Sequence, residues 1–144
     1  MLRKLMGRRF NDRLSRLASA GLLAASLIGC AALEPAKPED AVKRLATARL
    51  QSLMAGDFDK AYKMLMPSYR SVVSFDRFRG DTTGVAFWKG TEVIKVDCEP
   101  EKCTARVRID FQHPLAAKVG GVLSTHIDEI WLLEGDQWWL FQKL

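Results

Sequence analysis

Apolar residues recur at helical spacing in the part of the chain that follows residue 37. Between Pro38 and Gly56 they return every three or four positions with charged residues between them, which predicts an amphipathic helix. Asp57 is a favourable N-cap for a second helix, which we expect to stop at Pro67. Four apolar residues stand at helical spacing within it: Phe58, Ala61, Tyr62 and Leu65. Ser74 is expected to cap a short third helical turn.

The pattern then changes to the alternation that is typical of β-strands. Residues 103–112 place four apolar side chains on one face and four polar side chains on the other. Further strands are expected over 85–98, 122–133 and 138–143, with a connection over 113–121. Two helices and a short third helical turn followed by antiparallel strands predict an α+β domain.

A third pattern occupies the N-terminal residues. Residues 1–29 hold six basic residues and one acidic residue, and residues 17–28 are uncharged and mostly apolar. A helix of these 12 residues would span about 18 Å, which is shorter than the roughly 20 residues that cross a bilayer. The order of basic and then apolar residues therefore predicts a signal peptide. The alternative is an N-terminal anchor that is never cleaved.

The net positive charge of the chain lies in the predicted signal peptide. Residues 1–29 account for the whole formal net charge of +5, so the remainder carries equal numbers of basic and acidic side chains, interspersed along the chain. Proteins that bind nucleic acids need clustered Lys and Arg to neutralise phosphates. We therefore expect no nucleic-acid partner.

The leader closes on Leu27, Ile28, Gly29 and Cys30, which resemble the lipobox of bacterial lipoproteins. The resemblance implies cleavage after residue 29 and a lipid on Cys30, which would anchor the protein in a membrane. Ala31 follows the cysteine, which is similar to the sorting pattern for the outer membrane. We expect a protein of the bacterial cell envelope, held at the outer membrane and facing the periplasm.

The assignment of Cys30 to lipidation leaves an even number of cysteines, Cys98 and Cys103. In an exported protein this predicts one disulfide, which would join two strands at a hairpin. A metal site lacks a second pair of ligands, and the spacing is not that of a Cys-x-x-Cys redox pair. We therefore expect neither a metal nor a cofactor.

The tether between the lipid and the domain is short. Residues 30–37 form the lipidated N-terminus and the tether, and residues 31–37 reach about 23 Å when fully extended. The domain over 38–144 is therefore expected to work close to the bilayer, on envelope proteins or on small solutes that reach it.

Two motifs carry a family resemblance. The first helical hairpin contains Gly-Asp-Phe-Asp-Lys-Ala-Tyr at 56–62, and the last strand hairpin contains Gly-Asp-Gln-Trp-Trp-Leu at 135–140. Over 38–144 the chain resembles the nuclear transport factor two-like superfamily, which includes SnoaL-like and ketosteroid-isomerase-like proteins, and within it the small lipoproteins of unassigned function. The resemblance implies a curved, mainly antiparallel sheet of four to five strands packed with the helices into a cone-like fold with a cavity.

The expected function is binding of a partner protein or a small ligand without catalysis, and self-association is a further expectation. The alternative is an enzyme similar to ketosteroid isomerases or cyclases, acting on a small apolar molecule in the cone. That chemistry needs a carboxylate base and oxyanion donors. The candidates are Asp110, His126 and Asp128, with the Tyr62 hydroxyl as donor. The competing interpretation of the three strand residues is a solvated sheet face.

Overall fold

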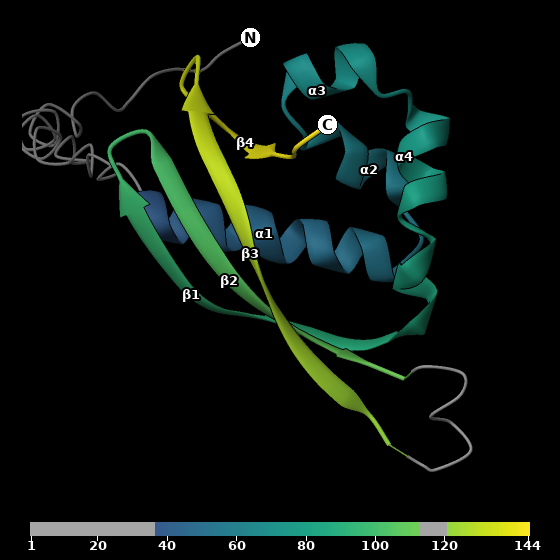
Figure 1. The fold of residues 1–144 in the computed structure, drawn as a ribbon. Coiled ribbons are helices and arrows are strands. Elements are labelled where there is room, and N and C mark those ends of the chain that lie inside the picture. Colours follow the sequence, from purple (N-terminus) through teal and green to yellow (C-terminus); the bar gives the residue numbers. More distant parts are fainter. Residues whose placement is uncertain (1–36, 113–120) are drawn as a thin grey trace, which may run out of the picture. The chain divides into compact units, whose positions relative to one another are not determined.

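The computed structural model describes residues 37–112 and 121–144, which form an α+β domain (Figure 1). The helices come first: α1 (Pro38–Met54), α2 (Phe58–Lys63), α3 (Pro67–Val72), α4 (Phe75–Asp81) and the 3₁₀ helix η1 (Thr83–Phe87). The strands follow: β1 (Trp88–Glu99), β2 (Lys102–Phe111), β3 (Leu123–Glu134) and β4 (Gln137–Phe141). The signal peptide over 1–29, its lipobox, all but the last residue of the tether, and residues 113–120 lie outside the described residues.

The first helix follows from its sequence. Pro38 stands in the first turn of α1, where the missing N–H costs no hydrogen bond, and acidic residues follow it. Gly56 adopts a φ of 76°, a left-handed conformation that suits glycine just beyond a helix. The inward stripe of α1 is buried: Val42, Ala46, Leu50 and Leu53.

The expected caps at Asp57 and Ser74 are present. The Asp57 carboxylate accepts a hydrogen bond from the backbone N–H of Lys60 at 3.1 Å, and the Ser74 hydroxyl accepts one from Arg77 at 3.3 Å. These bonds fix where α2 and α4 begin.

The number of helices differs from the prediction. Pro67 was expected only to stop the second helix, but it begins a separate helix, α3, because proline fits the first turn. The second helix already ends at Lys63, and Leu65 instead forms an isolated bridge with Leu140 of β4. Residues 85–87, which the sequence pattern assigned to the first strand, belong to η1.

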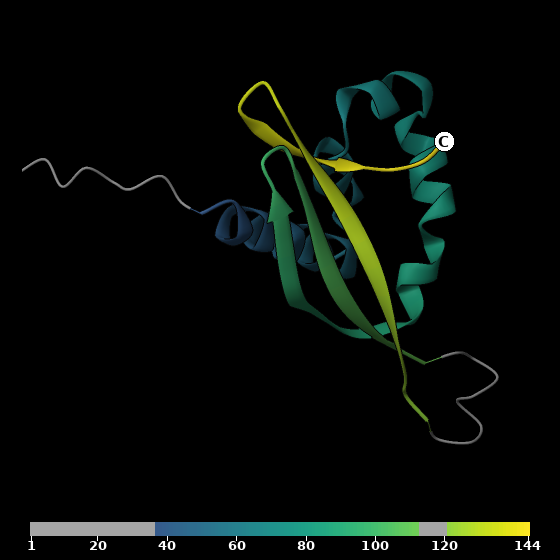
Figure 2. The ribbon, with the colours of Figure 1, turned by 60° about the vertical axis from the view of Figure 1, so that its left-hand side comes forward.

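The sheet is antiparallel with strand order β1-β2-β3-β4, so it has four strands. β2 and β3 pair without a register shift from Lys102–Leu132 to Phe111–Leu123. β1 has two irregularities against β2, near Gly90 and Ile94. Such bulges bend a strand, and Figure 2 shows β1 and β2 curving along their length.

The predicted disulfide is present at the β1–β2 hairpin. Cys98 lies directly opposite Cys103 in the register, their Cα atoms are 4.1 Å apart, and the two side chains are joined. Cys103 is fully buried, so the bridge ties the hairpin to the core.

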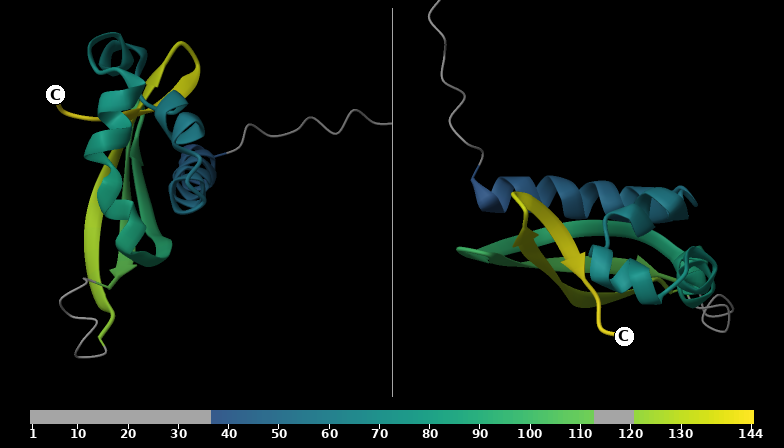
Figure 3. Two further views of the ribbon diagram at one scale, coloured as in Figure 1. Left: turned by 90° about the vertical axis from the view of Figure 1, so that its right-hand side faces the viewer. Right: turned by 90° about the horizontal axis from the view of Figure 1, so that it is seen from above.

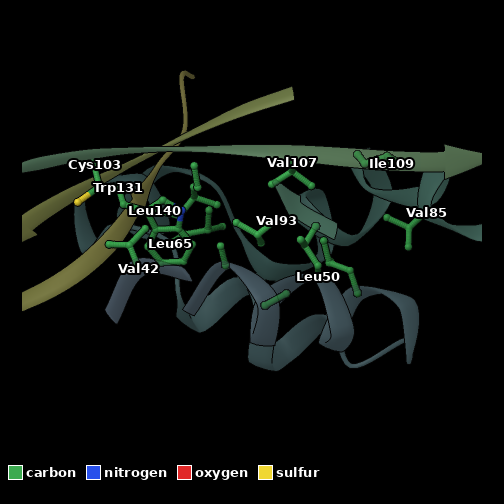
Figure 4. Packing of buried hydrophobic residues seen from close by; sticks show 14 of the residues in the cluster. Val42, Leu50, Leu65, Val85, Val93, Cys103, Val107, Ile109, Trp131 and Leu140 are labelled. Carbon is green, nitrogen blue, oxygen red and sulfur yellow. The ribbon is translucent and has the colours of Figure 1, made fainter. Parts of the chain in front are cut away.

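The core lies between α1 and one face of the sheet. α1 packs against β1 and β2, while α2, α3 and α4 gather beside its C-terminal half (Figures 1 and 3). Figure 4 shows Trp131 beside Val42, Leu65 and Leu140 in this layer. Of the helices in the described part of the chain, none has the length and apolar character to cross a membrane.

Strand β4 covers only one half of β3. It pairs with β3 from Ile130 to Glu134, and Figures 1 and 2 show no strand beside the other half on that side. We refer to residues 129–134 as the closed half of β3 and to residues 123–128 as its open half.

Candidate functional site

The three strand residues proposed as catalytic candidates lie on the face of the sheet that points away from α1. Asp128 is exposed, and both of its carboxylate oxygens accept hydrogen bonds from Arg106, each at 2.9 Å. These hydrogen bonds lower the pKa of Asp128 from its ordinary value. Asp128 is therefore an ionised partner in a surface ion pair.

The other two members of that face are similarly placed. The Asp110 carboxylate accepts a hydrogen bond from the Ser124 hydroxyl at 2.6 Å and lies 3.4 Å from the Arg108 guanidinium. His126 is exposed and stands opposite Arg108 in the register. The alternation of the strands brings these residues together, but on a solvated, ion-paired face rather than in a cavity.

Tyr62 does not join them. It is half-buried on α2, and its hydroxyl donates a hydrogen bond to the Val73 carbonyl at 2.6 Å. Its ring packs against Phe75 and Phe78 at centroid distances of 5.6 and 5.4 Å. Tyr62 therefore holds α2 against α4, and its hydroxyl proton is engaged by the backbone.

A buried ion pair occupies the inner side of the sheet. Glu129 on β3 is 5% exposed and Arg49 on α1 is 8% exposed, and the Arg49 Nη1 contacts the Glu129 Oε1 directly. The indole N–H of Trp131 donates to the other carboxylate oxygen at 3.2 Å. Among the described residues, the Arg49 Nε finds no hydrogen-bond partner.

Burial governs the ionisation of this pair. Desolvation raises the pKa of Glu129 from its ordinary value, and the opposing effects of Arg49 and of the Trp131 hydrogen bond are smaller. A buried carboxylate that stays protonated more readily is a feature of acid–base sites and also of structural ion pairs. Here both of its oxygens are already bound by protein groups.

The sequence-based search missed this pair, although a signal existed. Glu129 occupies an inward position of β3, two residues before the buried Trp131. Arg49 stands between Ala46 and Leu50 on the buried stripe of α1. An acid and a base that each interrupt an apolar face are the pattern expected of a buried pair.

Among the surface hollows of the domain are two that are lined by described residues. One, of about 320 Å³, is lined by Met66, Tyr69 and the residues from Phe141 to Leu144, with Ser68. The other, of about 390 Å³, lies at the α1–α2 corner and is lined by Asp57, Phe75 and Arg79 among others. Neither hollow is lined by Glu129 or Arg49. Within residues 37–112 and 121–144, no cluster of His, Cys, Asp and Glu could hold a metal ion.

Comparisons with known proteins identify the fold. No protein-family model matches the chain, and no curated protein matches it. A SEC-C motif-containing protein from Rhodopseudomonas palustris is similar in structure, with a TM-score of 0.54 and 16% identity, over 68% of this chain and 73% of that one.

Two NTF2-like structures, that is, nuclear transport factor two-like structures, also match. One, from Campylobacter jejuni and named as a transpeptidase, has a TM-score of 0.50 and 13% identity, over 71% of this chain and 98% of that chain. Another, of unknown function from Shewanella oneidensis, has a TM-score of 0.50 and 9% identity, over 70% of this chain and 92% of that chain. The described domain has an NTF2-like fold. At such low identity the similarity extends to the fold alone.

Proposed function

We propose that this protein is a lipid-anchored component of the bacterial cell envelope whose NTF2-like domain binds a partner protein or a small ligand without catalysis. The anchor is supported by the lipobox-like residues Leu27 to Cys30. The joined Cys98 and Cys103 suit an oxidising compartment such as the periplasm.

The hydrogen bonds of the buried polar groups support binding without catalysis, because these groups are already engaged by other parts of the domain. The buried carboxylate, Glu129, is bound by Arg49 and Trp131, and the hydroxyl of Tyr62 is bound by the Val73 carbonyl. A general base must reach a proton on its substrate, and these groups already serve the fold. The acids of the outer face are ion-paired, Asp128 with Arg106 and Asp110 with Arg108.

We further propose that the helices and the sheet form a cone that is open at one end. α1 closes on β1 and β2, whereas the inner face of the open half of β3 still exposes Leu123 and Ile127. We infer that binding uses this open end of the sheet rather than a sealed interior.

The anchor is tested by Cys30→Ala. We expect this variant to lose labelling by a fatty-acid probe and to leave the membrane fraction, because the thioether would have no acceptor sulfur. The matched control is Cys98→Ala with Cys103→Ala, which removes the other two cysteines and should keep the label. Unchanged labelling and fractionation of Cys30→Ala would refute the anchor.

The destination within the envelope rests on Ala31. We expect Ala31→Asp to shift the protein from the outer to the inner membrane on a density gradient, in a host that uses the enterobacterial sorting pattern. Ala31→Ser is the matched control and should leave the distribution unchanged. An inner-membrane location of the wild type would overturn this part.

The binding role is tested by cross-linking in intact cells. We expect the wild type to capture a defined set of envelope proteins or further copies of itself. Ile127→Ser at the open end should reduce this capture, whereas Ile94→Ser, an equally exposed apolar site on β1, should not. Equal capture by the two variants would place binding elsewhere on the domain.

One observation favours the enzymatic alternative. Glu129 is buried and desolvation raises its pKa, a feature that acid–base residues share with structural ion pairs. Turnover of a small apolar ketone that Glu129→Gln abolishes, with the fold retained by circular dichroism, would favour an isomerase-like enzyme. Turnover that survives Glu129→Gln would exclude this residue as the base.

A further inference from the structure

Among the described residues, no strand pairs with the outer edge of the open half of β3. β4 pairs with β3 only from Ile130 onward, so residues 123–128 have β2 on one side and no strand from the described residues on the other. Two apolar side chains there remain exposed, Leu123 by 50% and Ile127 by 39%. Unpaired N–H and C=O groups on an edge strand are a template for another strand.

The backbone groups that face this edge can be identified. The N–H of Leu133 donates to the Glu101 carbonyl at 2.9 Å, on the β2 side. Successive residues of an antiparallel strand turn these groups alternately to either side, and β3 pairs with β2 without a register shift. Ser124, His126 and Asp128 therefore direct their N–H and C=O groups to the free edge.

The sequence of the edge is symmetric in chemical type. From residue 123 to residue 127 it runs apolar, polar, threonine, polar and apolar: Leu123, Ser124, Thr125, His126 and Ile127. We infer that this edge pairs antiparallel with the same edge of a second copy of the chain, about a two-fold axis at Thr125. A two-fold interface requires self-complementarity of this kind.

The pairing places compatible side chains opposite one another. On the inner face, Leu123 lies opposite Ile127 of the second copy, and Thr125 lies opposite Thr125. On the outer face, Ser124 lies opposite His126, and these two residues exchange backbone hydrogen bonds. Apolar pairs and Thr–Thr pairs stabilise antiparallel strands.

Charge distinguishes this edge from the other edge of the sheet. Residues 123–127 include no acidic or basic residue apart from His126, and the neighbouring Asp128 is paired with Arg106. The β1 edge instead has two bulges and exposed charges, Lys89, Glu92 and Lys95. Bulges and edge charges oppose strand pairing, so β3 rather than β1 is the pairing edge.

The symmetry also agrees with anchoring in one membrane. A two-fold axis perpendicular to a sheet maps each face of the sheet onto itself. α1 of both copies, whose N-terminal end continues from the tether, therefore lies on the same face of the joined sheet. Two lipids could then reach one bilayer.

The register is tested by cysteine cross-linking of the full chain. Thr125→Cys is made in a Cys30→Ser background, so that the introduced cysteine is the single unpaired one. Directly opposed residues in a non-hydrogen-bonded pair have Cα atoms about 4.5 Å apart, within disulfide range. We expect mild oxidation to give a covalent dimer on a non-reducing gel.

The matched controls are Ser124→Cys and His126→Cys, one position away on either side. In the proposed register each faces a different residue of the second copy, so its own copy lies beyond disulfide reach. Strong cross-linking at residue 125 with little at 124 and 126 supports the pairing. Equal cross-linking at all three positions, or none at any, overturns it.

The association itself is measured by sedimentation of the full chain in detergent. We expect a reversible dimer, and Ile127→Lys should raise its dissociation constant by about tenfold or more, because it replaces both apolar pairs. Ile94→Lys on the β1 edge should leave it unchanged. A wild type that stays monomeric over the micromolar range refutes self-pairing, even if Thr125→Cys fails to fold.

This inference extends the proposed binding role by naming one partner. The two can fail separately. Loss of labelling in Cys30→Ala and capture of other envelope proteins test the anchored binding role, whereas the residue-125 cross-link tests the self-pairing edge alone.

Discussion

The two halves of β3 share one strand and one unbroken register with β2, yet their environments differ. In the closed half, Trp131 is fully buried and Glu129 is held by Arg49 of α1. In the open half, Leu123 and Ile127 occupy the same inward face and remain exposed. Identical strand geometry therefore leads to a core in one place and to an accessible surface in the other.

The cause of the difference is the neighbouring elements. β4 lies beside the closed half, and the bridge between Leu65 and Leu140 ties it to the segment after α2. α1 packs on β1 and β2 and contributes Arg49 only to the closed half. An inward position in a strand becomes buried only where another layer covers it, so the closed half stabilises the fold and the open half stays accessible.

The largest expected effect separates the two halves by stability. Trp131→Ala removes a fully buried aromatic ring and should lower the free energy of unfolding by about 3–5 kcal/mol. Ile127→Ala, the matched change in the open half, should cost roughly 1 kcal/mol or less, because little of this side chain is withdrawn from water. Urea denaturation measures both. Equal losses would contradict the distinction between the halves.

Removing one partner of the buried ion pair should lower the stability strongly, and removing both partners should restore most of it. Glu129→Leu leaves the Arg49 charge buried without its partner and should cost about 3–5 kcal/mol in urea denaturation. The double variant Arg49→Met with Glu129→Leu should recover most of that loss, because no unpaired charge remains. A double variant no more stable than Glu129→Leu would show that the pair is not the source of the cost.

The disulfide should have an intermediate effect. Cys103 lies opposite Trp131 at the closed half, and replacing Cys98 and Cys103 with alanine should lower the free energy of unfolding by about 2 kcal/mol, since the closed loop is short. The control is Thr125→Ala, a small polar change in the open half. Two free thiols in the unreduced, unfolded wild type would contradict the bridge itself.

The smallest expected effect is on the pH dependence of stability. The contributions of the adjacent residues Glu129 and Asp128 should change with pH in opposite directions. Burial raises the pKa of Glu129 above 4.5, so its contribution to stability is full below that pH and is lost as the pH rises through the raised folded pKa. Arg106 lowers the pKa of Asp128 below 3.8, so its contribution is present above that pH and is lost as the pH falls.

Comparison with the neutral variants isolates each group. The stability of the wild type relative to Glu129→Gln should fall as the pH is raised from about 4.5, whereas its stability relative to Asp128→Asn should fall as the pH is lowered through the acid range. Urea midpoints across a pH series measure both differences. A shared direction for the two residues would show that Glu129 is not desolvated.

Much of the fold could be predicted from the sequence because its signals are local. The apolar stripe of α1, the caps at Asp57 and Ser74, and the hairpin joined by Cys98 and Cys103 all depend on residues close along the chain. The alternation of β2 likewise identified which side chains face inward. The leader and its lipobox remain predictions, because they lie outside the described residues.

The errors arose where local signals conflict. Pro67 is compatible both with the end of one helix and with the start of another, and only the bridge of Leu65 to β4 decides between them. For Asp110, His126 and Asp128 the sequence left a site in a cavity and a solvated sheet face as alternatives, and the structure places all three on one solvated, ion-paired face.

The sequence by itself determined the order of helices before strands, the inward and outward faces of the strands and the disulfide, because each depends on spacing along the chain. Only the tertiary structure decided which inward residues are covered. Arg49 and Glu129 are 80 positions apart, and their contact exists because α1 packs on β1 and β2, from where the Arg49 side chain reaches Glu129 of β3. The same packing leaves the open half uncovered, since burial depends on elements that are distant in sequence.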